Sequence, residues 1–231
     1  MKITLYVDVV SPFTYIAYYV LRHDPVFKDC EITYIPVFLR GIFKSAGNTP
    51  PLAIKNKSKW INEERLRWAK YFNIPMVANV PDGFPANTAN TMRTICALGH
   101  IASADQPASS SPSAPAQQAI VKALDAFYDA YWVHNRNITD KDVAADVLMG
   151  AGWGEQDLAK VGELVAGDAR RMLEENTDGA FAEGAFGLPW FACENDRGDK
   201  EGFWGVDHLG AVLDFLGLEK PTGDGRWRAM L

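Results

Sequence analysis

The feature that most constrains the fold is a strand pattern at the N-terminus that runs directly into a helix start. Residues Ile3 to Val10 alternate between apolar and more polar positions and end in an apolar pair, which is typical of a β-strand covered on both faces towards its end. Ser11 and Pro12 follow, and serine is a favoured N-cap while proline is a favoured first helical residue. A helix is therefore predicted from Pro12 to just before Pro25.

A second strand is predicted from Glu31 to Phe38, where apolar residues occupy both faces. The helix between the two strands favours a parallel pair with a right-handed crossover. Pro36 has no backbone N–H to give to a sheet, so it indicates an edge strand or an early end.

The last part of the chain returns to strands. The segments 190–193 and 202–206 flank a polar turn at 195–198 and predict a hairpin. Asp207 then follows the second strand and is expected to cap a helix that stops at Gly217.

The middle of the chain predicts helices separated by loops. Residues 41–57 predict a long loop, and the Pro/Ser/Ala-rich residues 106–115 predict a flexible surface loop. Apolar side chains recur at helical spacing in the rest of this region. The predicted helices cover Ser58 to before Pro75, Asn87 or Thr88 to Leu98, Ile120 to Tyr131, Thr139 to Met149, and Leu158 to Leu173, the last with Gly162 and Gly167 in its interior.

This element order defines the expected fold class. A β-α-β unit, a block of helices and a β-β-α unit are the order of a thioredoxin-like α/β fold with a helical domain inserted between its halves. We predict a split thioredoxin-like domain at residues 1–54 and 180–231, and an inserted helical domain at residues 55–179. The 231 residues are 48% hydrophobic, which is enough to bury a sizeable core.

Charge and cysteine usage exclude several classes of function. The net charge of −6 argues against a nucleic-acid or anionic-membrane partner, which needs a basic face. No apolar run approaches the ~18–20 residues of a membrane helix, and the N-terminus lacks the pattern of a secretory signal. Cys30, Cys96 and Cys193 are widely spaced, and neither they nor the four histidines predict a metal site. A reducing compartment fits this cysteine usage.

Ser11 is the first candidate site residue, because it opens a helix directly after a strand. A helix N-terminus presents unpaired N–H groups and about half a positive charge, so it binds anions and lowers the pKa of a thiol. Lowering a thiol pKa from ~8.5 to ~6.5 takes about 2.7 kcal/mol, and a charge-assisted hydrogen bond of ~1.5–3 kcal/mol from Ser11 plus the helix field supplies it. A plain helix cap is the alternative interpretation of Ser11-Pro12.

Three further segments hold candidate binding groups. Leu188-Pro189 precedes a strand, where a cis-proline in a thioredoxin-like fold lets its preceding residue offer backbone groups to a peptide; an ordinary trans-proline is the alternative. Asp207, after Val206, carries a carboxylate that suits an ammonium group, and an N-cap is the alternative. Asn48 and Lys55 are placed to clamp a ligand, or simply form a polar turn.

Together these segments resemble the kappa class of glutathione transferases and the related 2-hydroxychromene-2-carboxylate isomerases, both in the DsbA-like branch of the thioredoxin superfamily. The resemblance covers residues 3–218. The matching segments are Tyr6–Phe13, Gly47-Asn48 with Pro50-Pro51, Arg136–Thr139, and Gly184–Pro189.

The resemblance implies roles for these positions, with glutathione as co-substrate and no metal. Ser11 is the implied catalytic residue, which hydrogen-bonds the sulfur; Leu188 pairs with the cysteinyl backbone and Asp207 binds the γ-glutamyl end. The inserted helices would roof the second-substrate pocket. The chain has Val206 where a small polar residue is usual, and His208 where arginine is usual. The implied glutathione-binding residues are Ser11, Pro12, Phe13, Asn48, Lys55, Leu188, Pro189, Val206 and Asp207.

The leading functional hypothesis is conjugation of the glutathione thiolate to a small hydrophobic electrophile. A glutathione-dependent isomerase is the alternative, because Arg65–Ala69 resembles the isomerases, and a non-catalytic glutathione-binding dimeric protein is the third. A disulfide oxidoreductase would need a cysteine pair at residues 11–14, where the chain has Ser-Pro-Phe-Thr. We expect a homodimer without nucleic-acid or membrane partners. We expect an intracellular location, cytoplasmic or else mitochondrial or peroxisomal; Ala229–Leu231 only loosely matches a peroxisomal signal.

Overall fold

The computed structural model describes residues 1–103, 114–221 and Trp227. Most of the predicted loop at 106–115 therefore lies outside the described residues, and its last two residues begin a helix. The tail after Pro221, with the Ala229–Leu231 signal, also lies outside them, apart from Trp227.

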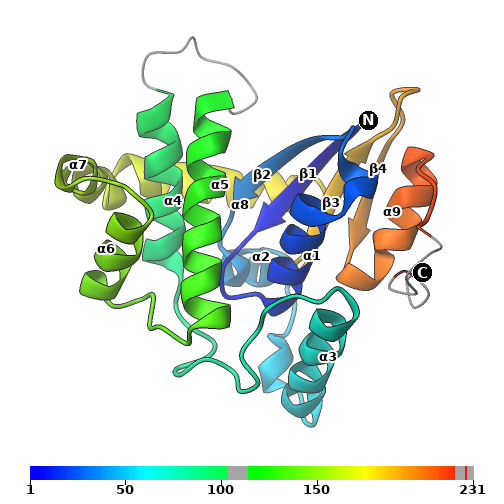
Figure 1. The fold of residues 1–231 in the computed structure, drawn as a ribbon, viewed down its shortest axis with the longest axis horizontal. Coiled ribbons are helices and arrows are strands. Elements are labelled where there is room, and N and C mark those ends of the chain that lie inside the picture. The colour runs from blue at the N-terminus through cyan, green and yellow to red at the C-terminus, as the bar shows by residue number, and fades with distance from the viewer. Residues whose placement is uncertain (104–113, 222–226, 228–231) are drawn as a thin grey trace.

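The centre of the fold is a four-stranded mixed sheet in the order β2-β1-β3-β4 (Figure 1). β1 and β2 are parallel, whereas β3 is antiparallel to β1 and to β4. The predicted parallel pair, the edge position of the second strand and its early end at proline are all confirmed. The strands are β1 (Lys2–Val7), β2 (Glu31–Pro36), β3 (Trp190–Glu194) and β4 (Lys200–Trp204).

Helices cover the sheet because side chains alternate along its strands. Ile3, Leu5 and Val7 of β1 belong to the main core, which includes residues of α1 and α9. Tyr6 points to the other face and packs with Ile42 of α2 and Ala180 of α8. The helices are α1 (Pro12–His23), α2 (Leu39–Ser45), α3 (Lys57–Tyr71), α4 (Ala89–Ala102), α5 (Ala114–Tyr128), α6 (Lys141–Gly150), α7 (Glu155–Val165), α8 (Asp168–Ala182) and α9 (Leu209–Leu216).

Shorter helical turns join these elements. A π-helical turn continues α5, where the prediction had one uninterrupted helix. The short turns are 3₁₀ at Pro25–Phe27, Pro51–Ala53 and Val206–His208, and π at Asp129–Val133.

The inserted helices lie between β2 and β3 in the chain, as predicted. In Figure 1, α4 and α5 stand side by side next to β2, and α3 lies apart from them, below α1. Gln117 of α5 ties this block to the sheet through hydrogen bonds with the backbone of Tyr34 in β2. The thioredoxin-like fold with an inserted helical part is thereby confirmed. The exact domain boundaries stay a proposal, and a division at residue 180 would cut the end of α8.

The predicted loop at 41–57 is wrong in part, because α2 lies at its start and a 3₁₀ turn within it. Tertiary contacts outweigh the weak local pattern here. Leu39 donates its N–H to the carboxylate of Asp8, and Ile42 is fully buried. Neither contact is visible as a helical repeat in so short a segment.

Two helix boundaries in the insertion also differ from the prediction. α6 is capped by Asp140, whose carboxylate accepts the N–H groups of Asp142 and Val143. The hydroxyl of Thr139, the predicted cap, donates to Asn137 instead. The single helix predicted from 158 to 173 is two helices that meet at Gly167, which lies outside both.

The prediction that Asp207 caps the last helix is wrong. β4 ends at Trp204, and Gly205 turns the chain at φ 96° into the 3₁₀ turn that contains Asp207. α9 then begins at Leu209 without a side-chain cap. The Asp207 carboxylate is thereby free of a capping role.

Candidate active site

The start of α1 places Ser11 at the end of β1 as a true N-cap. The Thr14 N–H donates to Ser11 Oγ over 3.2 Å, and the Tyr15 N–H donates to the Ser11 carbonyl over 3.1 Å. Pro12 has no N–H, so among the described residues the Phe13 N–H is the donor of this first turn without an acceptor. The Ser11 hydroxyl accepts one bond and keeps its hydrogen to donate, so capping and anion binding are compatible.

Asp8 lies behind Ser11 and is completely buried. Its carboxylate accepts hydrogen bonds from the Val10 N–H (3.1 Å), the Leu39 N–H (2.9 Å) and the Thr88 hydroxyl (2.7 Å). Burial raises the pKa of Asp8 above the ordinary range, and these hydrogen bonds oppose that rise without cancelling it. Burying the ionised Asp8 carboxylate costs folding free energy, and its three hydrogen bonds offset part of that cost.

The Leu188-Pro189 peptide bond is cis, as a thioredoxin-like fold requires at this place. Leu188 is buried and lines both cavities described below. Asn48 holds the neighbouring backbone, because its Nδ2 donates to the Phe186 carbonyl over 2.9 Å. Asn48 therefore joins the segment after α2 to the segment before β3.

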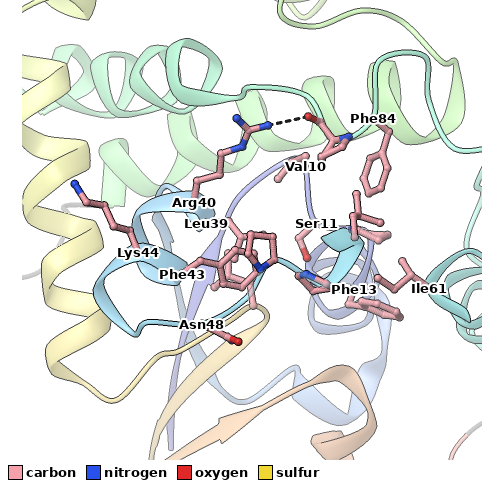
Figure 2. A pocket seen from close by; sticks show the side chains of 16 residues that line it. Val10, Ser11, Phe13, Leu39, Arg40, Phe43, Lys44, Asn48, Ile61 and Phe84 are labelled. Carbon is pink, nitrogen blue, oxygen red and sulfur yellow. Dashed lines mark hydrogen bonds between the residues drawn. The ribbon is translucent and has the colours of Figure 1, made fainter. Parts of the chain in front are cut away.

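One cavity of about 530 Å³ opens beside Ser11 (Figure 2). Most of its lining is apolar, including Phe13, Phe43 and Phe84. Arg40 lies at its edge, where its guanidinium donates to the Pro85 carbonyl over 3.1 Å. The lining contains no acidic residue. This cavity is suited to an apolar ligand next to the Ser11 hydroxyl.

A second cavity of about 720 Å³ adjoins the first and shares Phe13, Asn48 and Leu188 with it. It contains charges of both signs, from Lys57, Glu64 and Asp207. Aromatic side chains also line it: Phe13 and Trp60 have ring centroids 6.5 Å apart, and Phe186 and Trp204 are 5.0 Å apart. A zwitterionic peptide matches this mixture better than an apolar molecule does.

Gly205 is required for the position of Asp207. Its φ of 96° is one that side chains rarely adopt, and a Cβ there would collide with the Asp207 carboxylate. The same carboxylate lies 3.5 Å from Nδ1 of His208. The turn therefore fixes Asp207 at the wall of the second cavity.

The structure brings most of the sequence-predicted residues together and leaves one apart. Lys55 is exposed and lines neither cavity, whereas Lys57 is half-buried and lines the second. Lys57 was not among the predicted site residues because the segment 41–57 was predicted as a loop, whereas Lys57 begins α3. The predicted residues that line a cavity are Ser11, Pro12, Phe13, Asn48, Leu188, Pro189, Val206 and Asp207.

Two further findings concern only the part of the chain that the structure describes. No group of three or more His, Cys, Asp or Glu side chains there is placed to hold a metal ion. No helix there has the length and apolar character needed to cross a membrane.

Comparison with known proteins gives a consistent family relationship. A model of the DSBA-like thioredoxin domain matches residues 2–217. Glutathione S-transferase kappa 1 of Rattus norvegicus is 28% identical over 229 residues, which cover 95% of this chain and 92% of that protein. Glutathione S-transferase kappa 1 of Caenorhabditis elegans is 24% identical over 229 residues, 96% of this chain and 94% of the relative. A solved 2-hydroxychromene-2-carboxylate isomerase has a TM-score of 0.71 at 23% identity, and 94% and 95% of the two chains are covered.

Proposed function

Since the chain belongs to the DSBA-like thioredoxin domain family, we propose that it is a kappa-type glutathione transferase in which Ser11 holds the thiolate of glutathione. The observation that carries the proposal is the place of Ser11 in the wall of the first cavity, two residues before Phe13, which lines both adjoining cavities. The similarity to glutathione transferases along almost the whole chain supports it.

The α1 N-terminus supplies the groups that a thiolate needs. The Ser11 hydroxyl and the Phe13 N–H both have a hydrogen to donate, and the helix adds its positive field. The surroundings are largely apolar, which strengthens these interactions over their value in water. We propose that together they lower the pKa of the bound thiol, so that its proton passes to solvent near neutral pH.

We propose that the second cavity takes the tripeptide. Glutathione carries one ammonium and two carboxylates, and the cavity offers Asp207 to the first and Lys57 to a carboxylate. Leu188 pairs with the cysteinyl backbone, and Val206 contributes its N–H at the γ-glutamyl end. The family usually has a small polar residue at the position of Val206, and this difference in the side chain leaves the backbone contact intact.

We propose that the first cavity takes the electrophile. Ser11 then holds the sulfur at the wall of this cavity, facing a carbon of the second substrate. A sulfur–carbon bond forms with an electron pair from the thiolate, and the carbon–leaving-group bond breaks so that the leaving group departs with its pair. The apolar lining keeps water from this step and favours a small hydrophobic substrate.

Calorimetric titration with glutathione tests the proposal, followed by turnover of an aryl chloride. We expect Ser11→Ala to reduce turnover about tenfold to a hundredfold, which corresponds to a charge-assisted hydrogen bond of ~1.5–3 kcal/mol. Ser103→Ala is the matched control, because Ser103 is also a cap residue, at the C-terminal end of α4, and its hydroxyl donates to the His100 carbonyl away from both cavities. Absence of binding at millimolar glutathione, or full activity of Ser11→Ala, would overturn the proposal.

An isomerase is the second candidate, since the 2-hydroxychromene-2-carboxylate isomerase shares the fold over most of both chains. The isomerase-like segment that contains Arg65 does not decide the matter. Arg65 is completely buried and donates to the carbonyls of Val77 and Ala78, and it lines neither cavity. Turnover of a hydroxychromene carboxylate without turnover of the aryl chloride would favour the isomerase, and binding without either turnover would favour a non-catalytic protein.

A further inference from the structure

We propose that Asp8 is a positioning residue for the thiolate site: its carboxylate fastens three of the chain segments that wall the Ser11 cavity. This inference rests on the proposed function where it concerns the thiolate. Asp8 lines neither cavity, so it acts through other residues.

Each hydrogen bond to Asp8 comes from a different wall. Val10 precedes Ser11 and lines the first cavity, and Leu39 begins α2 and also lines it. Thr88 belongs to the segment that carries Phe84 and Pro85, which also line it. One carboxylate thereby holds the strand-to-helix turn, the α2 start and the approach to α4.

Asp8 also shapes the Ser11 turn through its own backbone. The Ser11 N–H donates to the Asp8 carbonyl over 3.1 Å while the Val10 N–H donates to the Asp8 carboxylate. The intervening Val9 is fixed by the insertion, because its N–H meets Met92 Sδ at 3.5 Å and its carbonyl accepts from Trp132 Nε1 at 2.8 Å. The inserted helices thus hold the backbone that aims the Ser11 hydroxyl.

A carboxylate is the group that fits these partners. A carboxylate only accepts, and all three partners have a hydrogen to donate. In Asp8→Asn, either orientation of the amide sets its NH₂ group against a backbone N–H, that of Leu39 or that of Val10. The substitution preserves volume and disturbs the arrangement selectively.

Positioning and electrostatics predict opposite results for this substitution. If Asp8 acted mainly as a nearby anion, its removal would make a bound thiolate easier to form and would lower the thiol pKa. If Asp8 positions Ser11, its removal weakens the hydrogen bond to the thiolate and raises the thiol pKa. The sign of the change therefore separates the two roles.

The experiment measures the pKa of the enzyme-bound glutathione thiol from the ultraviolet absorbance of the thiolate. We expect Asp8→Asn to raise that pKa enough to reduce the thiolate fraction about tenfold at a pH below it. Asp24→Asn is the matched control: Asp24 is also buried, but it caps the turn beyond the far end of α1 and binds Trp227. It should leave the thiol pKa unchanged even where it lowers the melting temperature.

Thr88→Val is the second variant, because it removes one of the three bonds at constant volume. It should raise the thiol pKa less than Asp8→Asn does. If Asp8→Asn fails to fold, the result with Thr88→Val decides. An unchanged or lowered thiol pKa in the folded variant would overturn the positioning role.

A measurement without glutathione separates this inference from the proposed function. Amide hydrogen exchange at Val10 and Leu39 should be faster in Asp8→Asn and unchanged in Asp24→Asn. If the wild-type protein binds no glutathione, the proposed function fails, and the exchange result alone then decides whether Asp8 fastens the cavity walls. Unchanged exchange at both amides would overturn that role as well.

Discussion

At the scale of single residues, the site depends on groups that serve structure and chemistry at once. Ser11 caps α1 through one lone pair and keeps its hydrogen for a ligand. Asn48 holds the backbone of Phe186 while it lines both cavities. The local sequence indicates the structural role of such residues. Their place in a cavity becomes visible only when segments that are distant in the sequence meet in the fold.

Lys57 and Lys55 offer a direct test of which cation contacts the peptide. Lys57 lines the second cavity, whereas Lys55 is exposed outside it. We expect Lys57→Ala to weaken glutathione binding about fivefold, because a partly exposed charge pair contributes ~1 kcal/mol. Lys55→Ala should leave the affinity measured by calorimetry unchanged. A larger loss of affinity in Lys55→Ala than in Lys57→Ala would contradict the proposed place of the peptide in the second cavity.

The titration of Asp8 predicts a pH dependence of stability. Because burial raises its pKa in the folded state, the folded chain binds this proton more tightly than the unfolded chain, in which an aspartate titrates near ~3.9. Ionisation of Asp8 therefore costs folding free energy as the pH rises from about 4 through the raised pKa. The unfolding free energy of the wild type minus that of Asp8→Asn should fall over this range, as urea denaturation at several pH values would show. A difference that does not vary with pH would contradict this.

At the scale of elements, the conformation of Gly205 has a consequence that two substitutions can measure. Gly205→Ala should destabilise the protein by ~1–3 kcal/mol, because φ 96° is strained for alanine and its Cβ would meet Asp207. Gly179→Ala is the control, since Gly179 lies inside α8 with open space around it; it should stabilise by ~0.5–1 kcal/mol. Thermal unfolding of both variants checks the opposite signs, and glutathione binding should weaken only in Gly205→Ala.

Strong local signals made most elements predictable from sequence. The β1-to-α1 junction is set by alternation followed by a cap and a proline, so the start of α1 at Pro12 was predicted to the residue, whereas β1 ends at Val7, three residues before the predicted end of the strand. α2 was missed because its stability comes from Asp8 and from burial of Ile42, which are contacts across the fold. The break between α7 and α8 was missed because Gly167 alone was read as a weak helical position rather than an end.

The candidate site was less predictable than the fold. Ser11, Leu188 and Asp207 could be named because they stand at element junctions. Asp8 could not, because an aspartate inside a strand pattern carries no sign of its three donors. The proposed positioning role of Asp8 depends on its hydrogen bonds with Leu39 and Thr88, and neither residue lies close to Asp8 in the sequence.

At the scale of the whole molecule, the homodimer expected from the family resemblance stays a prediction. The protein has exposed aromatic side chains, Trp60, Phe186 and Trp204, that line the second cavity. Sedimentation equilibrium should give twice the mass of the chain at micromolar concentration, with no change when glutathione is added. A mass equal to that of one chain would contradict the expected homodimer.

The fastening of Val9 by the insertion also determines when the site can form during protein synthesis. The ribosome produces the N-terminus first, but Met92 lies 83 residues after Val9, and Trp132 lies 123 residues after it. A nascent chain that ends before Trp132 therefore holds the serine without the contacts that fix its turn, and Asp207 is added later still. Ser11 is among the first residues to be made, and the site around it is among the last parts of the molecule to be completed.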